Sequence, residues 1–136
     1  MHYWLVKSDP GEYSFADLER DGTTAWTGIR NYQARNYLRQ MQKGDRVVVY
    51  HSGTERAVVG VASVAREAYP DPTADTADWE CVDLAFEHWL RRPVSLEQIK
   101  ATPALRTMQL LKQSRLSVMP LSAEEYRMLR VLAQEA

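Results

Sequence analysis

Five stretches of the chain have the hydrophobic pattern of β-strands: residues 3–7, 46–52, 57–65, 79–89 and 115–119. The first is a short apolar run that ends at the turn sequence Ser8-Asp9-Pro10-Gly11. The second and third are rich in valine and are separated by four residues that include a glycine, which predicts a hairpin or a meander. The fourth alternates, so its two predicted faces carry Val82, Leu84 and Phe86 on one side and Cys81, Asp83 and Ala85 on the other.

Helix signals flank these strands. Ser14 precedes FADLER and predicts the N-cap of a short helix that stops at Asp21-Gly22. Asn31 predicts the N-cap of a second helix, with Gly44 in the position of a left-handed C-terminal cap. The buried stripe of that helix is predicted to consist of Ala34, Leu38 and Met41. Three further helices are predicted: two open at capping boxes that begin at Ser95 and Ser122, and one covers residues 104–111.

The order of these elements predicts the class of fold. Strands gathered in the middle of the chain with helices on both sides indicate a mixed α+β domain, with a small sheet that curls or forms a barrel. Residues 68–78 contain two prolines and three aspartates and are predicted to be a loop. We find no repeat and no linker, so residues 1–136 are expected to form a single domain.

Composition narrows the compartment and the partners. One cysteine, Cys81, excludes an internal disulfide and a thiolate zinc cluster, and a reducing, cytoplasmic compartment is expected. The N-terminus lacks the pattern of a signal peptide, and no apolar run approaches the roughly 18 residues of a membrane span, so no membrane partner is expected. A net charge of −1 argues against a protein that coats polyanions over its whole surface.

Charge is nevertheless unevenly distributed along the chain. Residues 9–21 contain five acids and one arginine, whereas residues 26–46 contain five bases and one acid. The bases are Arg30, Arg35, Arg39, Lys43 and Arg46. They indicate either a local basic face or an ordinary solvated helix surface.

Catalytic and metal-binding patterns are weak. His51 and Ser52 are adjacent, but neighbouring strand residues point to opposite faces and cannot simply form a base–nucleophile pair. The three histidines stand far apart without a metal-ligand spacing, and there is no phosphate-loop glycine pattern. We therefore expect no metal and no cofactor.

The stretch WTGIRNYQARN carries residue types suited to recognition of a flat heterocycle. Trp26 and Tyr32 offer aromatic faces, and Asn31 and Gln33 offer amides that can read a base edge. Arg30, Arg35 and Lys43 could hold phosphates beside such a pocket. The alternative is that the two aromatic rings only anchor the helix while Asn31 only caps it.

Five collinear motifs resemble the EVE domain family: YWLVKSDP, WTGIRNYQARNYLR, VVVYHS, EAYPDPT and SRLSVMPLS. The resemblance covers nearly the whole chain, and RNYQARN is its most specific part. It implies a PUA-like fold, a mixed sheet curled into a pseudo-barrel with flanking α-helices. It also implies a non-catalytic reader that takes a modified base of DNA or RNA, such as a modified cytosine, into a pocket.

The same resemblance implies the site residues. The base pocket would be lined by Lys7, Ser8, Trp26, Asn31, His51, Ser52, Arg115 and Ser117. Within this set we expect Trp26 to stack on or cage the base, and Ser8, Asn31 and Ser52 to bond to its edge. Lys7, Arg30 and Arg35 would face phosphate.

Two departures from the family pattern affect the expected ligand. Thr27 stands where many members carry an acidic residue, and the segment between Pro72 and Trp79 is short. Both could alter which base is preferred. The sequence therefore predicts a monomeric protein that binds DNA or RNA carrying a modified base. Two alternatives remain. The first is an enzyme that uses His51 or Asp83 as an acid–base group, and the second is a protein-interaction adaptor whose pocket is vestigial.

Overall fold

One six-stranded sheet organises residues 1–135, which are the residues described by this computed structural model. The strands are β1 (Tyr3–Ser8), β2 (Thr23–Ala25), β3 (Arg46–His51), β4 (Ala57–Pro70), β5 (Glu80–Ser95) and β6 (Val118–Leu121). Their order across the sheet is β2-β5-β4-β3-β1-β6. The pair β1 and β3 is parallel, and the other neighbouring pairs are antiparallel. The α+β class predicted from the sequence is confirmed.

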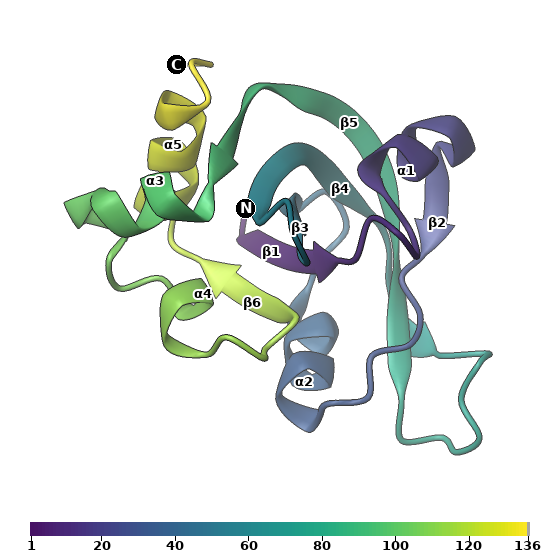
Figure 1. Cartoon of the computed structure of the whole chain (residues 1–136). Coiled ribbons are helices and arrows are strands. Elements are labelled where there is room, and N and C mark those ends of the chain that lie inside the picture. The colour runs from purple at the N-terminus through teal and green to yellow at the C-terminus, as the bar shows by residue number, and fades with distance from the viewer. Residues whose placement is uncertain (136) are drawn as a thin grey trace.

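The sheet curls because its two longest strands bend. β4 and β5 arch over the other strands (Figure 1), and their pairing contains several register shifts of the β-bulge kind, which increase local twist. Gly60 lies within the arch against the ring of Phe15, where an added Cβ would stand 2.1 Å from the nearest ring carbon. Among residues 1–135 the edge strands β2 and β6 do not pair with each other, so the sheet is curled but remains open.

Helices cover the rim and the faces of this sheet. They are α1 (Phe15–Asp21), α2 (Tyr32–Gln40), α3 (Leu96–Ala101), α4 (Gln109–Lys112) and α5 (Ala123–Leu132), with a 3₁₀ turn at Pro103–Leu105. The predicted N-caps are confirmed at Ser14, Asn31, Ser95 and Ser122, each of which accepts a hydrogen bond from a backbone N–H in the first turn. Ala34, Leu38 and Met41 are buried, as predicted for the stripe that docks α2.

Several predicted boundaries were wrong. The strand β2 was missed, and β4 and β5 run beyond their predicted ends, so that residues 68–70 are strand rather than loop. The predicted helix over 104–111 is broken into the 3₁₀ turn and α4. The strand errors share a cause, because strand pairing rather than local propensity decides how far an edge or a long hairpin extends.

Two further corrections concern single residues. Gly44 does not cap α2, because the helix ends at Gln40 with Met41 as its C-cap; Gly44 instead adopts φ 93° in the turn that follows. The last strand begins at Val118 rather than at residue 115 and includes Pro120. Proline is tolerated there because β6 is an edge strand, where a missing N–H costs little.

Candidate functional site

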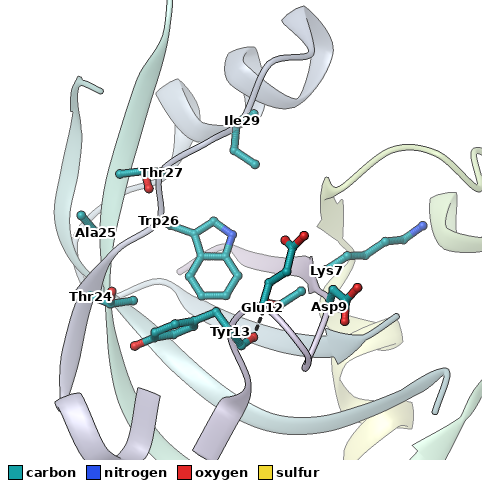
Figure 2. A pocket seen from close by; sticks show the side chains of 10 residues that line it. Lys7, Asp9, Glu12, Tyr13, Thr24, Ala25, Trp26, Thr27 and Ile29 are labelled. Carbon is teal, nitrogen blue, oxygen red and sulfur yellow. Dashed lines mark hydrogen bonds between the residues drawn. The ribbon is translucent and has the colours of Figure 1, made fainter. Parts of the chain in front are cut away.

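A hollow of about 320 Å³ opens between the end of β1 and the segment that leads from β2 to α2. We call it the Trp26 hollow. One wall consists of Lys7, Ser8, Asp9, Glu12 and Tyr13, and the other of Thr24, Ala25, Trp26, Thr27 and Ile29 (Figure 2). Its volume lies at the lower end of the range of small-molecule pockets, about 300–1,000 Å³.

The first wall is shaped by the turn after β1. The Asp9 carboxylate accepts the N–H of Gly11 at 2.8 Å, and the Asp9 carbonyl accepts the N–H groups of Glu12 and Tyr13, both at 2.9 Å. The hydroxyl of Ser8 donates to the carbonyl of Tyr13 and closes the turn. Ser8 therefore lines the hollow, but its proton is already used to hold the wall.

Trp26 forms the aromatic surface of the second wall. Its backbone N–H donates to Val82 at 2.8 Å, and its ring meets Tyr13 edge to face, with ring centroids 6.1 Å apart. The residue is only 8% exposed, yet it borders the hollow (Figure 2). Within residues 1–135 the indole N–H donates to no protein acceptor. A buried ring that borders a cavity and keeps its donor available suits a bound heterocycle.

Asp71 fixes the position of the second wall from the far side. Its carboxylate accepts the N–H of Gly28 at 2.9 Å, the guanidinium of Arg30 at 3.0 Å, and both the N–H and the hydroxyl of Thr73. Burial alone would raise the pKa of Asp71, but these hydrogen bonds outweigh it and lower the pKa to about 2. Gly28 adopts φ 86°, a backbone conformation that side chains disfavour, which lets its N–H meet the carboxylate.

Charges around the hollow are of both signs. Asp9 and Glu12 are exposed residues of the first wall, and the side chain of Lys7 extends away from the indole (Figure 2). The Lys7 ammonium donates to the carbonyl of Ser114 at 2.7 Å, and burial lowers the pKa of this group. The pocket thus offers carboxylate acceptors as well as donors, which suits a base with an exocyclic amine.

Two more hollows adjoin the first. One of about 230 Å³ contains Lys7 and Ser52, and one of about 360 Å³ contains Asn31 and Arg115. Lys7 borders both the first and the second hollow, and Ser114 borders both the second and the third. The predicted base-pocket residues are therefore spread over three adjoining hollows, with Lys7, Ser8 and Trp26 in the first.

His51 and Ser117 lie outside these three hollows. The N–H of Phe15 donates to Nε2 of His51 at 3.0 Å, so the neutral ring carries its proton on Nδ1, which meets Glu55 at 2.7 Å. Nε2 thus holds the start of α1, and Nδ1 holds the turn after β3. Ser117 is half-buried, and its carbonyl accepts the N–H of Lys7 at 2.9 Å. Neither residue lines the Trp26 hollow.

The three predicted phosphate contacts have different surroundings. Arg30 is paired with the buried Asp71, so its charge is largely compensated. Arg35 donates to the carbonyl of Asp78 at 2.9 Å and to the amide oxygen of Asn36. Lys43 is exposed in the turn beyond the C-terminal end of α2, the end opposite to the hollow.

Sequence reasoning missed most of the residues that line the hollow, among them Asp9 and Glu12. Tyr13 forms part of the pocket wall, and Asp71 holds the opposite wall. The only signal for Asp71 was the turn-rich sequence PDPT, in which an aspartate followed two residues later by threonine favours a local carboxylate–backbone turn. The partner of that carboxylate lies 43 residues away, at Gly28, and cannot be identified locally.

The curled mixed sheet with flanking helices defines an α+β protein of the PUA-like class. The EVE domain, as a sequence family, matches residues 2–132, and the chain belongs to that family. The predicted resemblance is thereby confirmed. None of the helices in residues 1–135 is long and apolar enough to cross a membrane.

Individual relatives agree with this assignment. Thymocyte nuclear protein 1 of Rattus norvegicus is 35% identical over 92% of this chain and 70% of its own length. An NMR structure of a protein from Rhodopseudomonas palustris is 42% identical, with a TM-score of 0.93 and coverage of 98% of this chain and 94% of that one. The human THYN1 protein, solved in complex with DNA containing 5-methylcytosine, is 30% identical, with a TM-score of 0.91 and coverage of 100% and 99%.

Proposed function

We propose that this protein binds DNA that carries a modified cytosine and holds the modified base, turned out of the helix, in the Trp26 hollow. The observation that carries the proposal is Trp26 itself, a largely buried indole that borders a cavity with its N–H available among the described residues. The human relative solved with 5-methylcytosine DNA supports the choice of ligand. A base taken out of its stack needs groups that read its edge, and the available indole N–H of Trp26 is one such donor.

The chemistry of the walls suits cytosine in particular. Cytosine presents an exocyclic amine next to a ring nitrogen and a carbonyl. In our proposal Glu12 or Asp9 accepts from the amine, and the indole N–H of Trp26 donates to an acceptor on the ring. Thymine carries a carbonyl in place of the amine and would meet the carboxylates unfavourably.

Replacement of the indole by a phenyl ring tests the proposal. Trp26→Phe keeps an aromatic ring but removes the N–H, so affinity for a duplex with one 5-methylcytosine is expected to fall by about tenfold, since an unmet acceptor costs about 1–3 kcal/mol. Fluorescence anisotropy with labelled duplexes measures this loss. Thermal melting of the variant checks that it remains folded.

The matched control is Trp89→Phe, the same replacement at a half-exposed tryptophan on β5. It should leave DNA affinity unchanged. Equal affinities of both variants and the parent protein would overturn the role of Trp26. Equal affinity for modified and unmodified duplexes would overturn the reading of a modified base, and a preference for modified RNA would redirect the proposal to that polymer.

We infer a binding module rather than an enzyme. The two residues that sequence reasoning offered as acid–base groups have structural partners: His51 meets Phe15 and Glu55, and Asp83 accepts from the hydroxyl of Tyr69. Mass spectrometry of a bound duplex after long incubation should return the modified base intact. Conversion of the base, lost in His51→Ala, would favour the enzyme instead.

A further inference from the structure

A second aromatic feature lies next to the Trp26 hollow, where α2 begins. Tyr32, at the first turn of α2, stacks on Trp79, which follows the loop between β4 and β5; the ring centroids are 4.8 Å apart and the planes 27° from parallel. Tyr32 is 57% exposed, an unusual position for a large aromatic side chain that packs on another ring. We call this pair the Tyr32–Trp79 platform.

One face of the Tyr32 ring remains open. The guanidinium carbon of Arg35 lies 4.8 Å from the centroid of Tyr32 and 6.0 Å from that of Trp79. With the rings themselves 4.8 Å apart, these distances form a triangle with an acute angle at Tyr32. Arg35 lies over the Tyr32 ring on the same side as Trp79, so neither of them covers the other face of this half-exposed ring.

Arg35 keeps its charge available beside the ring. Among the described residues its guanidinium donates to neutral acceptors, the carbonyl of Asp78 and the amide of Asn36. Arg30, which lies 5.9 Å from the Trp79 ring, differs because the buried Asp71 compensates its charge. An exposed ring with a charged guanidinium packed against one face and the other face uncovered has the composition of a nucleotide-stacking surface, where the ring meets a base and the cation meets a phosphate.

The platform is attached to the wall of the Trp26 hollow. The side-chain carboxylate of Asp71 bonds to Gly28 and Arg30, which lie in the segment between Trp26 and Tyr32. The backbone N–H of Asp71 donates to the carbonyl of Trp79 at 3.0 Å. Figure 1 shows the loop between β4 and β5 beside the segment that leads into α2. Tyr32 follows Trp26 by six positions, so their Cα atoms are at most about 22 Å apart. A DNA strand advances about 3.4 Å per nucleotide, so one strand can reach both places within a few nucleotides.

We propose that the open face of Tyr32 stacks on a base that flanks the modified nucleotide, while Arg35 contacts the phosphate of that flanking nucleotide. This inference rests on the proposed function, because it takes the Trp26 hollow as the place of the modified base. The platform then supplies affinity for the polymer, and the hollow supplies the choice of base. Stacking tolerates any base, so the platform adds little preference for a particular sequence.

A set of duplexes with abasic sites tests the stacking contact. Each duplex carries one 5-methylcytosine, with an abasic site at successive positions on either side of it. Tyr32→Ala is expected to lower affinity for the intact duplex by about tenfold, the loss typical of one stacked base. At one position the abasic site should lower the affinity of the parent protein for the duplex by a similar factor. At the same position it should leave the affinity of Tyr32→Ala unchanged.

Controls separate stacking from other effects. Tyr32→Phe retains the ring and should bind like the parent protein, which also guards against a loss caused by a disturbed α2. If the abasic site lowers the affinity of Tyr32→Ala and of the parent protein equally at every position, the stacking contact is overturned. If Trp26→Phe weakens binding while Tyr32→Ala does not, the proposed function stands and only the platform fails. If neither variant weakens binding, the hollow itself is not the DNA site.

Discussion

At the scale of single residues, Asp71 shows how a buried charge positions a surface. Its carboxylate is surrounded by donors from three places in the chain, the segment at Gly28, the guanidinium of Arg30 and its own loop at Thr73. A buried carboxylate is stable only when such donors compensate its lost hydration. The same bonds hold the wall of the Trp26 hollow, so stability and pocket shape depend on one side chain.

Asp71→Asn is expected to lower the free energy of unfolding by about 2 kcal/mol at neutral pH, because the pKa of the carboxyl falls from 3.8 in the unfolded chain to about 2. A depressed pKa stabilises the folded state above the unfolded value, and this contribution is lost as the pH falls through the folded value. The difference between parent and variant should shrink to about half by pH 3. Urea denaturation at a series of pH values measures it.

Asp75→Asn is the matched control, because Asp75 is exposed in the same loop. It should follow the parent protein at every pH. A difference for Asp71→Asn that stays constant from pH 7 to pH 3 would contradict the ionised, hydrogen-bonded carboxylate.

At the scale of elements, the start of α2 is determined by local sequence, whereas the neighbouring strand β2 is determined by tertiary pairing. Asn31 caps the helix, accepting the N–H of Ala34 at 2.9 Å, and this was predicted because a cap depends on neighbours three residues away. The strand β2, by contrast, has only three residues and exists through its pairing with β5. Its sequence, Thr-Thr-Ala, carries too little pattern to predict a strand.

Asn31→Ala should therefore destabilise the protein by about 1 kcal/mol, the usual cost of a lost N-cap. Asn31→Ser restores a side-chain acceptor at the same position and should recover most of that loss. Guanidinium denaturation of the three proteins measures the difference. Identical stability of Asn31→Ala and the parent protein would show that solvent satisfies the first turn equally well.

At the scale of the whole molecule, the charge distribution indicates that the protein contacts only a few phosphates of the DNA. The chain has a net charge of −1, and the exposed or half-exposed bases around the three hollows and the platform, apart from Arg30 on its Asp71 partner, are Lys7, Arg35, Arg56, Lys112 and Arg115. Each phosphate neutralised contributes about −0.9 to the slope of log affinity against log salt concentration. The first and second hollows share Lys7, and the second and third share Ser114, so the contacts are local rather than spread over the surface.

With one phosphate neutralised by each of these five bases, we therefore expect a slope of about −4 to −5 for binding to modified DNA. Arg35→Gln should make the slope shallower by about 1, because it removes one phosphate contact. Anisotropy titrations at several salt concentrations give the slopes. Arg92→Gln, at an exposed position on β5, is the control and should leave the slope unchanged; an equal change in both variants would point to a general effect of charge.

Much of the molecule follows from the sequence alone. The α+β class, the four N-caps, the buried stripe of α2 and the membership of the EVE domain family were all predicted from local pattern and motif. These features depend on residues a few positions apart or on a collinear set of motifs. The cytoplasmic location, the monomeric state and the single domain over 1–136 remain predictions.

Only the tertiary structure decided how the candidate residues are distributed. Lys7, Ser8 and Trp26 share one hollow, whereas the chain turns His51 toward Phe15 and away from the pocket. The bond from Gly28 to Asp71 and the stack of Tyr32 on Trp79 join parts of the chain more than forty residues apart. Sequence periodicity carries no information about contacts at that separation, because they are set by the way β4 and β5 bend around the core.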